Sequence, residues 1–142
     1  MYTDSYMAVG AAGVAGCFEF TGYVPYDVLP SLYARMSVFV APIWKESFGQ
    51  VAPFAMSMKV PVVGYDVGAI GEIIDNPNLL AAPADAEQLA RIAVRLLDSP
   101  AERHEVADFQ QDRAIQRFSV QAMIGRYSSI YSEITAQVEG RK

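Results

Sequence analysis

The stretch Val38-Phe39-Val40-Ala41-Pro42 decides the fold, together with Pro61-Val62-Val63-Gly64-Tyr65, which repeats its pattern further along the chain. Each is a short apolar run, rich in β-branched residues and bounded by proline, as is typical of a buried strand. Similar but weaker runs occupy Cys17 to Thr21 and Leu79 to Ala82. We therefore predict four strands.

Helical patterns separate these strands. Asp27 is a candidate cap for a helix over Val28 to Met36, in which Pro30 is tolerated because it lies in the first turn. Two more helices are predicted, one that ends near Met58 and one over Ala69 to Ile74. Strands that alternate with helices form a parallel sheet through right-handed crossovers. The fold class is thus α/β, a Rossmann-like parallel sheet flanked by helices.

A helical segment follows the last strand. Asp85 has Gln88 three residues later, which is the spacing of a capping box. Three helices are expected here. The inward residues of the first are Leu89, Ile92, Ala93, Leu96 and Leu97. Pro100 opens the second, whose inward residues are Val106, Phe109 and Ala114, and the third runs from about Ser119 with Met123, Tyr127, Ile130, Tyr131 and Ile134 inward. Residues 1–16, with the small-residue stretch Ala8 to Gly16, fit either a helix or a loop.

Composition narrows the function classes. The chain has 142 residues, 52% of them hydrophobic and 19% charged, which suits one domain with a real core. Its net charge of −5 provides no basic field for nucleic acid. The single cysteine, Cys17, forms no internal disulfide and is expected to pack inside a strand, so a reducing, cytoplasmic location is predicted. No apolar run reaches the roughly 20 residues that span a bilayer.

Ligands of parallel α/β sheets bind beyond the carboxyl ends of the strands. That rule selects the loops Gly22 to Asp27, Pro42 to Gly49 and Tyr65 to Ala69. The helix start after Gly49 suits an anion, and Glu46 beside it suits sugar hydroxyls. The same residues also fit a plain role, with Glu46 as a helix cap and Gly49 in a tight turn. In the third loop Gly68 allows close approach of a ligand to the backbone, and Glu72 fits an ordinary first-turn carboxylate.

Other chemistries lack their residues. His104 is the only histidine and lies among charged residues, so no zinc pattern is present and no metal is predicted. Ser47 has neither the Gly-x-Ser-x-Gly setting of a nucleophile nor a histidine partner, which argues against acyl transfer. No Walker-type phosphate loop occurs.

An ordered set of motifs resembles the group 1 glycosyltransferases, retaining enzymes built from two facing Rossmann-like domains. The motifs are Phe20-Thr21-Gly22-Tyr23-Val24, Leu29 to Tyr33, Val38 to Pro42, Glu46-Ser47-Phe48-Gly49-Gln50-Val51, Pro61-Val62-Val63, Gly68-Ala69-Ile70-Gly71-Glu72 and Leu79 to Asp85. The resemblance runs from Phe18 to Leu97. A weaker similarity over Phe118 to Tyr131 looks like the closing helix of that family.

The resemblance implies a donor-binding role for the chain. Glu46 would accept hydrogen bonds from the hydroxyls of the donor sugar. The segment Ser47, Phe48 and Gly49 would face the sugar or its diphosphate, and the backbone around Tyr23 and Val24 would border the base. The donor is a nucleotide diphosphate sugar, and the family implies no metal and no further cofactor.

Departures from the family pattern also carry predictions. The family has a second glutamate eight residues after the first, which holds the ribose, but here Phe54 stands there, after Pro53. The first strand of the domain and the acceptor domain have no counterpart. Residues 1–142 are therefore expected to be one domain, the carboxyl-terminal half of an enzyme truncated at its amino terminus. That half would pair with the acceptor domain, or with another copy through exposed strand edges.

Three alternatives stay open. Phe54 and Pro53 favour an inactive nucleotide-sugar-binding module of the same fold. A sugar-nucleotide epimerase shares the architecture but needs acids and bases that this chain does not show. A receiver-like domain fits the alternation of strands and helices but lacks an early acidic pocket. Peripheral association of the full-length enzyme with a membrane is a further possibility.

Overall fold

The computed structural model describes residues 2–45 and 48–139. Its elements, in chain order, are α1 (Tyr2–Ala11), η1 (Ala15–Cys17), α2 (Leu29–Tyr33), β1 (Phe39–Ala41), α3 (Val51–Ser57), β2 (Val62–Tyr65), α4 (Ile70–Ile74), η2 (Pro77–Leu79), β3 (Leu80–Ala81), α5 (Ala86–Asp98), α6 (Pro100–Phe118) and α7 (Val120–Glu139). The chain is thus an α/β protein, as predicted. No described helix is both long and apolar enough to cross a membrane.

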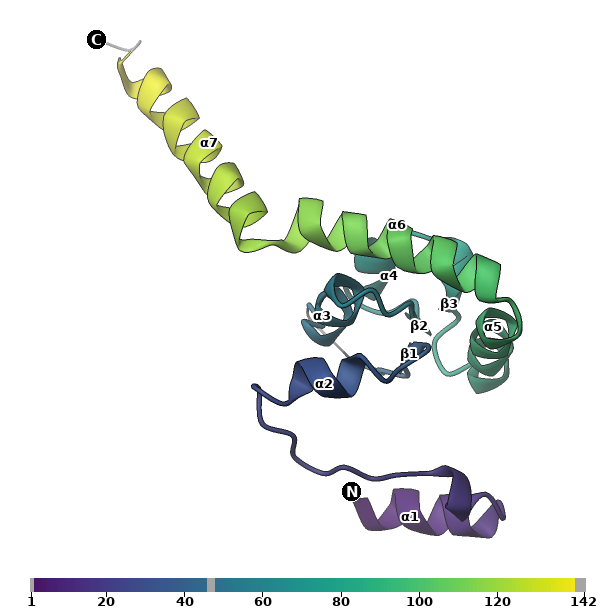
Figure 1. Cartoon of the computed structure of the whole chain (residues 1–142). Coiled ribbons are helices and arrows are strands. Elements are labelled where there is room, and N and C mark those ends of the chain that lie inside the picture. Colours follow the sequence, from purple (N-terminus) through teal and green to yellow (C-terminus); the bar gives the residue numbers. More distant parts are fainter. Residues whose placement is uncertain (1, 46–47, 140–142) are drawn as a thin grey trace.

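The sheet has three parallel strands in the order β1-β2-β3. The central strand β2 is buried at all of its residues, as expected for a parallel strand that helices cover on both faces. Around it pack the helices α3 to α6, and Figure 1 shows α6 running along the body. The core comprises mainly aliphatic residues, of which Met56, Val62, Val63, Ile70, Ile73, Ile74, Leu79 and Leu96 are almost fully buried.

One buried glutamine completes the sheet. The main-chain N–H of Val62 donates to Oε1 of Gln110 at 2.7 Å, and Nε2 of Gln110 donates to the carbonyl of Val62 at 3.0 Å. β3 pairs with β2 only from Gly64 onward, so no residue of β3 lies opposite Val62. The carboxamide of Gln110, on α6, pairs with Val62 in its place. Gln110 is 0% exposed, so both backbone groups would otherwise be buried without partners.

Arg113 joins the same helix to the end of α4. Its Nε donates to the carbonyl of Ile73 at 2.8 Å, and its Nη1 lies 2.7 Å from the carboxylate of Asp75. Asp75 ends α4 in the left-handed conformation, with a φ of 53°. A cation at the carboxyl end of a helix satisfies its free carbonyls and favours its dipole. Gln110 and Arg113 together fix α6 to the body.

The predicted cap of α5 is confirmed, with one difference. Oδ1 of Asp85 accepts from the main-chain N–H of Gln88 at 2.8 Å. The side chain of Gln88 does not complete a capping box, because its Oε1 accepts from the N–H of Ala82, beyond the end of β3. Leu89, Ile92 and Leu96 are buried as predicted, whereas Leu97 is exposed.

The strand expected at Cys17 to Thr21 is wrong. Cys17 ends the 3-10 turn η1 and is exposed, and the following residues form no strand in the described part of the chain. The charged Glu19 interrupts this short apolar run, and no residue of the run pairs with β1, the edge strand of the sheet. Helix α2 is also shorter than predicted and begins after Val28, without the cap expected from Asp27.

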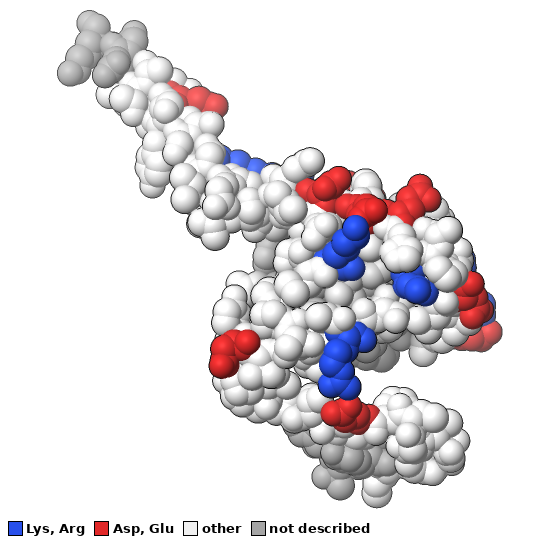
Figure 2. Space-filling model, in the orientation of Figure 1, with Lys and Arg blue, Asp and Glu red and all other residues white. Residues whose placement is uncertain are grey.

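The two ends of the chain lie away from the core. The open choice for residues 1–16 resolves as α1 and η1, which Figure 1 places apart from the sheet. Helix α7 leaves the end of α6 and extends away from the body (Figure 1). Its predicted apolar stripe exists, but every residue of that stripe is at least half exposed. On the face in Figure 2, charges of both signs gather over the body, and most of α7 is uncharged.

Candidate functional site

The carboxyl ends of all three strands meet at one edge of the sheet, because the strands are parallel and adjacent. The loops that leave this edge follow Ala41, Tyr65 and Ala81. Two of them were predicted to bind a ligand. The third predicted loop, Gly22 to Asp27, follows no described strand, and its Tyr26 lies against Phe54 of α3.

The loop after β1 leads into the start of α3. Gly49 is buried and has a φ of 72°, a left-handed conformation that glycine adopts without strain. Gln50 precedes the helix and gives it no side-chain cap. The N–H of Ala52 donates to the carbonyl of Gly49 at 3.0 Å and Pro53 has no N–H, so at most the N–H groups of Gln50 and Val51 are left in the first turn for a ligand. The ring of Phe48 lies edge-on to that of Phe118, 6.0 Å between centroids, which holds the loop against the end of α6. Glu46 and Ser47 lie outside the described residues.

Trp44 lies in the same loop and was not singled out from the sequence. Its ring is 69% exposed and lies 6.2 Å from that of Tyr65, in an edge-on geometry. Tyr65 is buried and ends β2, so the pair links the ends of two neighbouring strands. An aromatic residue in the loop at the carboxyl end of a strand is the signal that could have identified it. Trp44 is also the only tryptophan in the chain.

The loop after β2 offers a less favourable anion site. Gly68 has a φ of 52°, consistent with the predicted tight loop. The carboxylate of Asp66, however, lies over the first turn of α4, so close that a methyl group at Gly71 would overlap its Oδ1. Glu72 adds a second carboxylate in that turn, whereas α3 has no acidic residue in its first turn. An anion is therefore better accommodated at α3 than at α4.

Tyr23 and Val24 line a different part of the surface. Tyr23 is 89% exposed. Val24 contributes to a hollow of about 220 Å³ beside α2, which Thr21, Val28 and Leu32 also line. The structure thus brings Phe48, Gly49 and Gly68 to one edge of the sheet and places Val24 at a separate hollow, with Tyr23 exposed next to it in the chain.

Phe54, which replaces the second glutamate of the family pattern, serves in packing. Its ring lies edge-on to Tyr33 at 5.1 Å and 6.1 Å from the ring of Tyr26. Burial raises the pKa of Tyr33. Pro53 is compatible with α3 because the helix begins only at Val51, so the proline falls within its first turn. Phe54 therefore cannot hold ribose hydroxyls, and it leaves the helix start intact.

Other candidate chemistry is not assembled in the structure. Among the described residues, no three side chains of His, Cys, Asp or Glu come together as a metal site. His104 is exposed on α6, in agreement with the predicted surface position. Cys17 is exposed in η1, so the prediction that it packs inside a strand is wrong. The carboxyl edge of β1 and β2 therefore remains the candidate site.

Comparisons with known proteins agree on a family. A family profile described as "Glycosyl transferases group 1" matches residues 3–99. A 2-deoxystreptamine glucosyltransferase from Streptomyces kanamyceticus is 38% identical over 100 residues, which are 69% of this chain and 26% of the relative. A 2-deoxystreptamine N-acetyl-D-glucosaminyltransferase from Streptomyces fradiae is 36% identical over 124 residues, 86% of this chain and 27% of the relative.

A solved structure agrees as well. Sucrose-phosphate synthase from Thermosynechococcus elongatus superposes with a TM-score of 0.81 at 27% identity, over 92% of this chain and 33% of that protein. The chain therefore spans between about a quarter and a third of the length of these relatives.

Proposed function

The chain belongs to the group 1 glycosyltransferases, and from this premise we propose that it is the donor-binding half of a transferase that moves a hexose from a nucleotide diphosphate sugar to an acceptor, with retention at the anomeric carbon. The observation that carries the proposal is the start of α3. It lies at the carboxyl edge of the sheet, has no acidic residue in its first turn and directly follows the Glu46 segment.

Each proposed contact follows from the chemistry of the donor. The N–H groups of Phe48 and Gly49 would donate to the diphosphate or the sugar, with Ser47 between them and Glu46. The carboxylate of Glu46 would accept from sugar hydroxyls. Gly68 would let the donor approach the loop after β2. The hollow at Val24, which apolar side chains line together with the ion pair of Glu19 and Arg35, would receive the base, and Tyr23 would border it.

The reaction demands stabilisation of an anionic leaving group. When the bond from the sugar to the diphosphate breaks, negative charge develops on the departing oxygen. A helix start aimed at that oxygen lowers the barrier because its dipoles are already oriented. The proposal uses this helix start, and it assigns no metal or cofactor to the chain.

The acceptor domain is part of the proposal because the relatives are about three times as long as this chain. The apolar stripe of α7 provides a surface that such a domain could cover: Val120, Met123, Ile124, Tyr127, Ile130, Tyr131, Ile134 and Val138. The outer edge of β1, where Val40 is 41% exposed, offers a second surface. Pairing with another copy through that edge is the alternative, and native mass spectrometry distinguishes the two.

An inactive binding module of the same fold is the alternative function. Phe54 favours it, because a phenylalanine cannot accept hydrogen bonds from a ribose. The named relatives are transferases, however, and the packing of Phe54 against Tyr33 leaves the start of α3 free. We therefore prefer the enzyme.

The proposal is tested by comparing donors with and without the sugar. Trp44, exposed at the candidate site, reports binding through its fluorescence. UDP, GDP and ADP and their glucose conjugates are titrated into the wild-type chain and into Glu46→Gln. We expect one base to bind, and the substitution to weaken the sugar conjugate roughly tenfold while leaving the free nucleotide unchanged.

Glu72→Gln is the matched control, because it removes a carboxylate from the other helix start. Equal weakening of nucleotide and conjugate by Glu46→Gln would show that Glu46 does not contact the sugar. In the full-length enzyme the same variant should lose transfer activity. Binding without any transfer by the wild-type full-length enzyme would favour the inactive module.

A further inference from the structure

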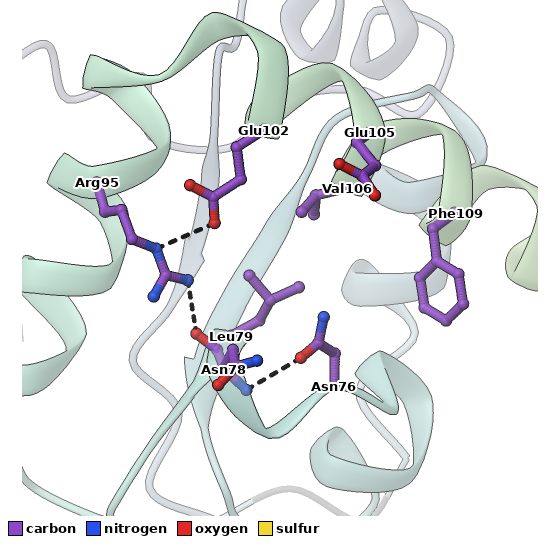
Figure 3. Close-up of a pocket in the computed structure, with 8 residues that line it drawn as sticks. All are labelled: Asn76, Asn78, Leu79, Arg95, Glu102, Glu105, Val106 and Phe109. Atoms are coloured by element: carbon purple, nitrogen blue, oxygen red, sulfur yellow. Dashed lines mark hydrogen bonds and ion pairs between the residues drawn. The ribbon is translucent and has the colours of Figure 1, made fainter.

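A second hollow, of about 310 Å³, lies between η2, α5 and α6 (Figure 3). η2 directly precedes β3, so this hollow lies at the amino end of the strands, on the opposite edge of the sheet from the proposed donor site. Its lining residues are Asn76, Asn78, Leu79, Arg95, Glu102, Glu105, Val106 and Phe109. None of them has a role in the donor site.

Part of the lining is already held in place. The Nε of Arg95 lies 3.2 Å from the carboxylate of Glu102, and its Nη2 donates to the carbonyl of Asn78 at 2.8 Å. This guanidinium therefore joins α5, the first turns of α6 and η2 (Figure 3). The contacts fix one wall of the hollow and occupy its only cation.

Two polar groups of the lining remain available. Oδ1 of Asn76 accepts from the main-chain N–H of Asn78 at 3.0 Å, which identifies the other terminal atom as the amide nitrogen. In Figure 3 this nitrogen points toward α6, where Glu105 lies. Within the described residues, neither the amide nitrogen of Asn76 nor the carboxylate of Glu105 has a recorded partner. The hollow thus presents a free donor and a free acceptor.

The rest of the lining is apolar. Leu79 is 1% exposed and Val106 is half-buried. Phe109 is 48% exposed, and its ring stands at the rim of the hollow (Figure 3). The sequence predicted that Phe109 would face the core, which is wrong, because Ala107, Gln110 and Ala114 take the buried face of α6. Phe109 is therefore an aromatic residue that the core does not use.

The charge of the lining discriminates between ligand classes. The lining carries two carboxylates, of Glu102 and Glu105, and one guanidinium that is already paired, so a phosphate or a nucleotide would be repelled. A sugar hydroxyl both donates and accepts, which suits Asn76 and Glu105, and the C–H face of a pyranose is apolar and suits Phe109. The volume is at the lower end of the range of about 300–1,000 Å³ of small-molecule sites.

We propose that this hollow binds a pyranose ring of a neutral saccharide, with Phe109 against its C–H face and with Asn76 and Glu105 on its hydroxyls. The site is separate from the donor site and does not rest on the proposed function. In a transferase it would hold a saccharide chain on the far edge of the donor half.

The test is a nuclear magnetic resonance titration of the full chain with methyl α-D-glucopyranoside, methyl α-D-mannopyranoside and maltose. The resonances followed are the side-chain amide of Asn76 and the methyl groups of Leu79 and Val106. We expect saturable shifts there with at least one saccharide and no shift at Gly49 or Gly68. UDP, titrated separately, should leave the resonances of the hollow unchanged.

Variants assign the contacts. Phe109→Ala should raise the dissociation constant roughly tenfold, whereas Phe109→Tyr keeps the ring and should retain binding. Tyr131→Ala, at an exposed aromatic residue of α7, is the control and should change nothing. The proposal is overturned if no saccharide gives saturable shifts, if Phe109→Ala binds like the wild type, or if UDP binds in the hollow.

Discussion

Helices α6 and α7 follow one another in the chain and have nearly the same length, 19 and 20 residues, yet only α6 belongs to the body of the protein. The polar residues of α6 bind distant backbone groups, as Gln110 binds Val62 and Arg113 binds Ile73. The hydroxyls of Ser129, Ser132 and Thr135 in α7 instead donate to carbonyls of their own helix. The more apolar helix, α7, is therefore the exposed one, because no other element of the described chain covers its apolar residues.

The largest expected effect is that of Gln110→Leu. The substitution leaves the N–H and the carbonyl of Val62 buried without partners, and each costs about 1–3 kcal/mol. We expect the free energy of unfolding to fall by about 2–6 kcal/mol in urea denaturation. Gln111→Leu is the matched control, since Gln111 makes a single exposed bond to Ser57 and should cost about 1 kcal/mol at most. Equal losses would contradict the distinction between the two glutamines.

Truncations test whether the body and α7 differ in packing. Leu96 of α5 is 0% exposed, and Leu96→Ala should cost about 2–5 kcal/mol of unfolding free energy. Ile134 of α7 is 53% exposed, and Ile134→Ala should change the stability by less than about 0.5 kcal/mol. A cost for Ile134→Ala that approaches that of Leu96→Ala would mean that α7 is covered in solution.

Two glycines sharpen the same contrast. A methyl group at Gly64, in β2, would stand 3.1 Å from the carbonyl oxygen of Ala41, so Gly64→Ala should cost about 1–3 kcal/mol by overpacking. A methyl group at Gly125, in α7, meets nothing within 4 Å. Gly125→Ala should instead favour the helix by about 0.5–1 kcal/mol and increase the helical circular dichroism. If both substitutions changed the free energy of unfolding in the same direction, β2 and α7 would not differ in packing as described.

The smallest effect concerns pH. Burial raises the pKa of Tyr33 above the value of the unfolded chain, about 10. The unfolded state therefore releases this proton first, and the stabilising contribution is complete below pH of about 10 and is lost as pH rises through the folded pKa. Tyr33→Phe should make the alkaline branch of the stability curve flatter than in the wild type. If Tyr33→Phe leaves the stability curve unchanged, Tyr33 is not the origin of the loss of stability at alkaline pH.

The parts predicted correctly from the sequence are those in which local and global signals agree. The run Val62-Val63 is apolar, β-branched and central in the sheet, and Asp85 is both a good cap and a helix start. The run at Cys17 fails because strand formation depends on a neighbour that short-range patterns do not reveal. Gln110 was not among the predicted inward residues of α6, although its spacing from Ala107 and Ala114 places it on their face.

The candidate site divides in the same way. The loops after β1 and β2 were located correctly, because the edge where parallel strands end follows from the topology alone. The carboxylate of Asp66 over the start of α4 and the contact of Trp44 with Tyr65 depend on how loops fold back, which no periodicity encodes. The roles assigned to Glu46, Ser47, Phe48, Gly49, Gly68, Tyr23 and Val24 stay predictions.

The glutamine that completes the sheet also sets an order of events during synthesis. Val62 and Gln110 are 48 residues apart, so β2 leaves the ribosome well before its last partner does. At about 5–20 residues per second, the backbone of Val62 waits roughly 2–10 s for the carboxamide that will cover it. During that interval the nascent chain exposes an unpaired strand edge, which a chaperone can shield and a neighbouring nascent chain can join. Slower translation between these two residues would lengthen the interval in which the edge is exposed.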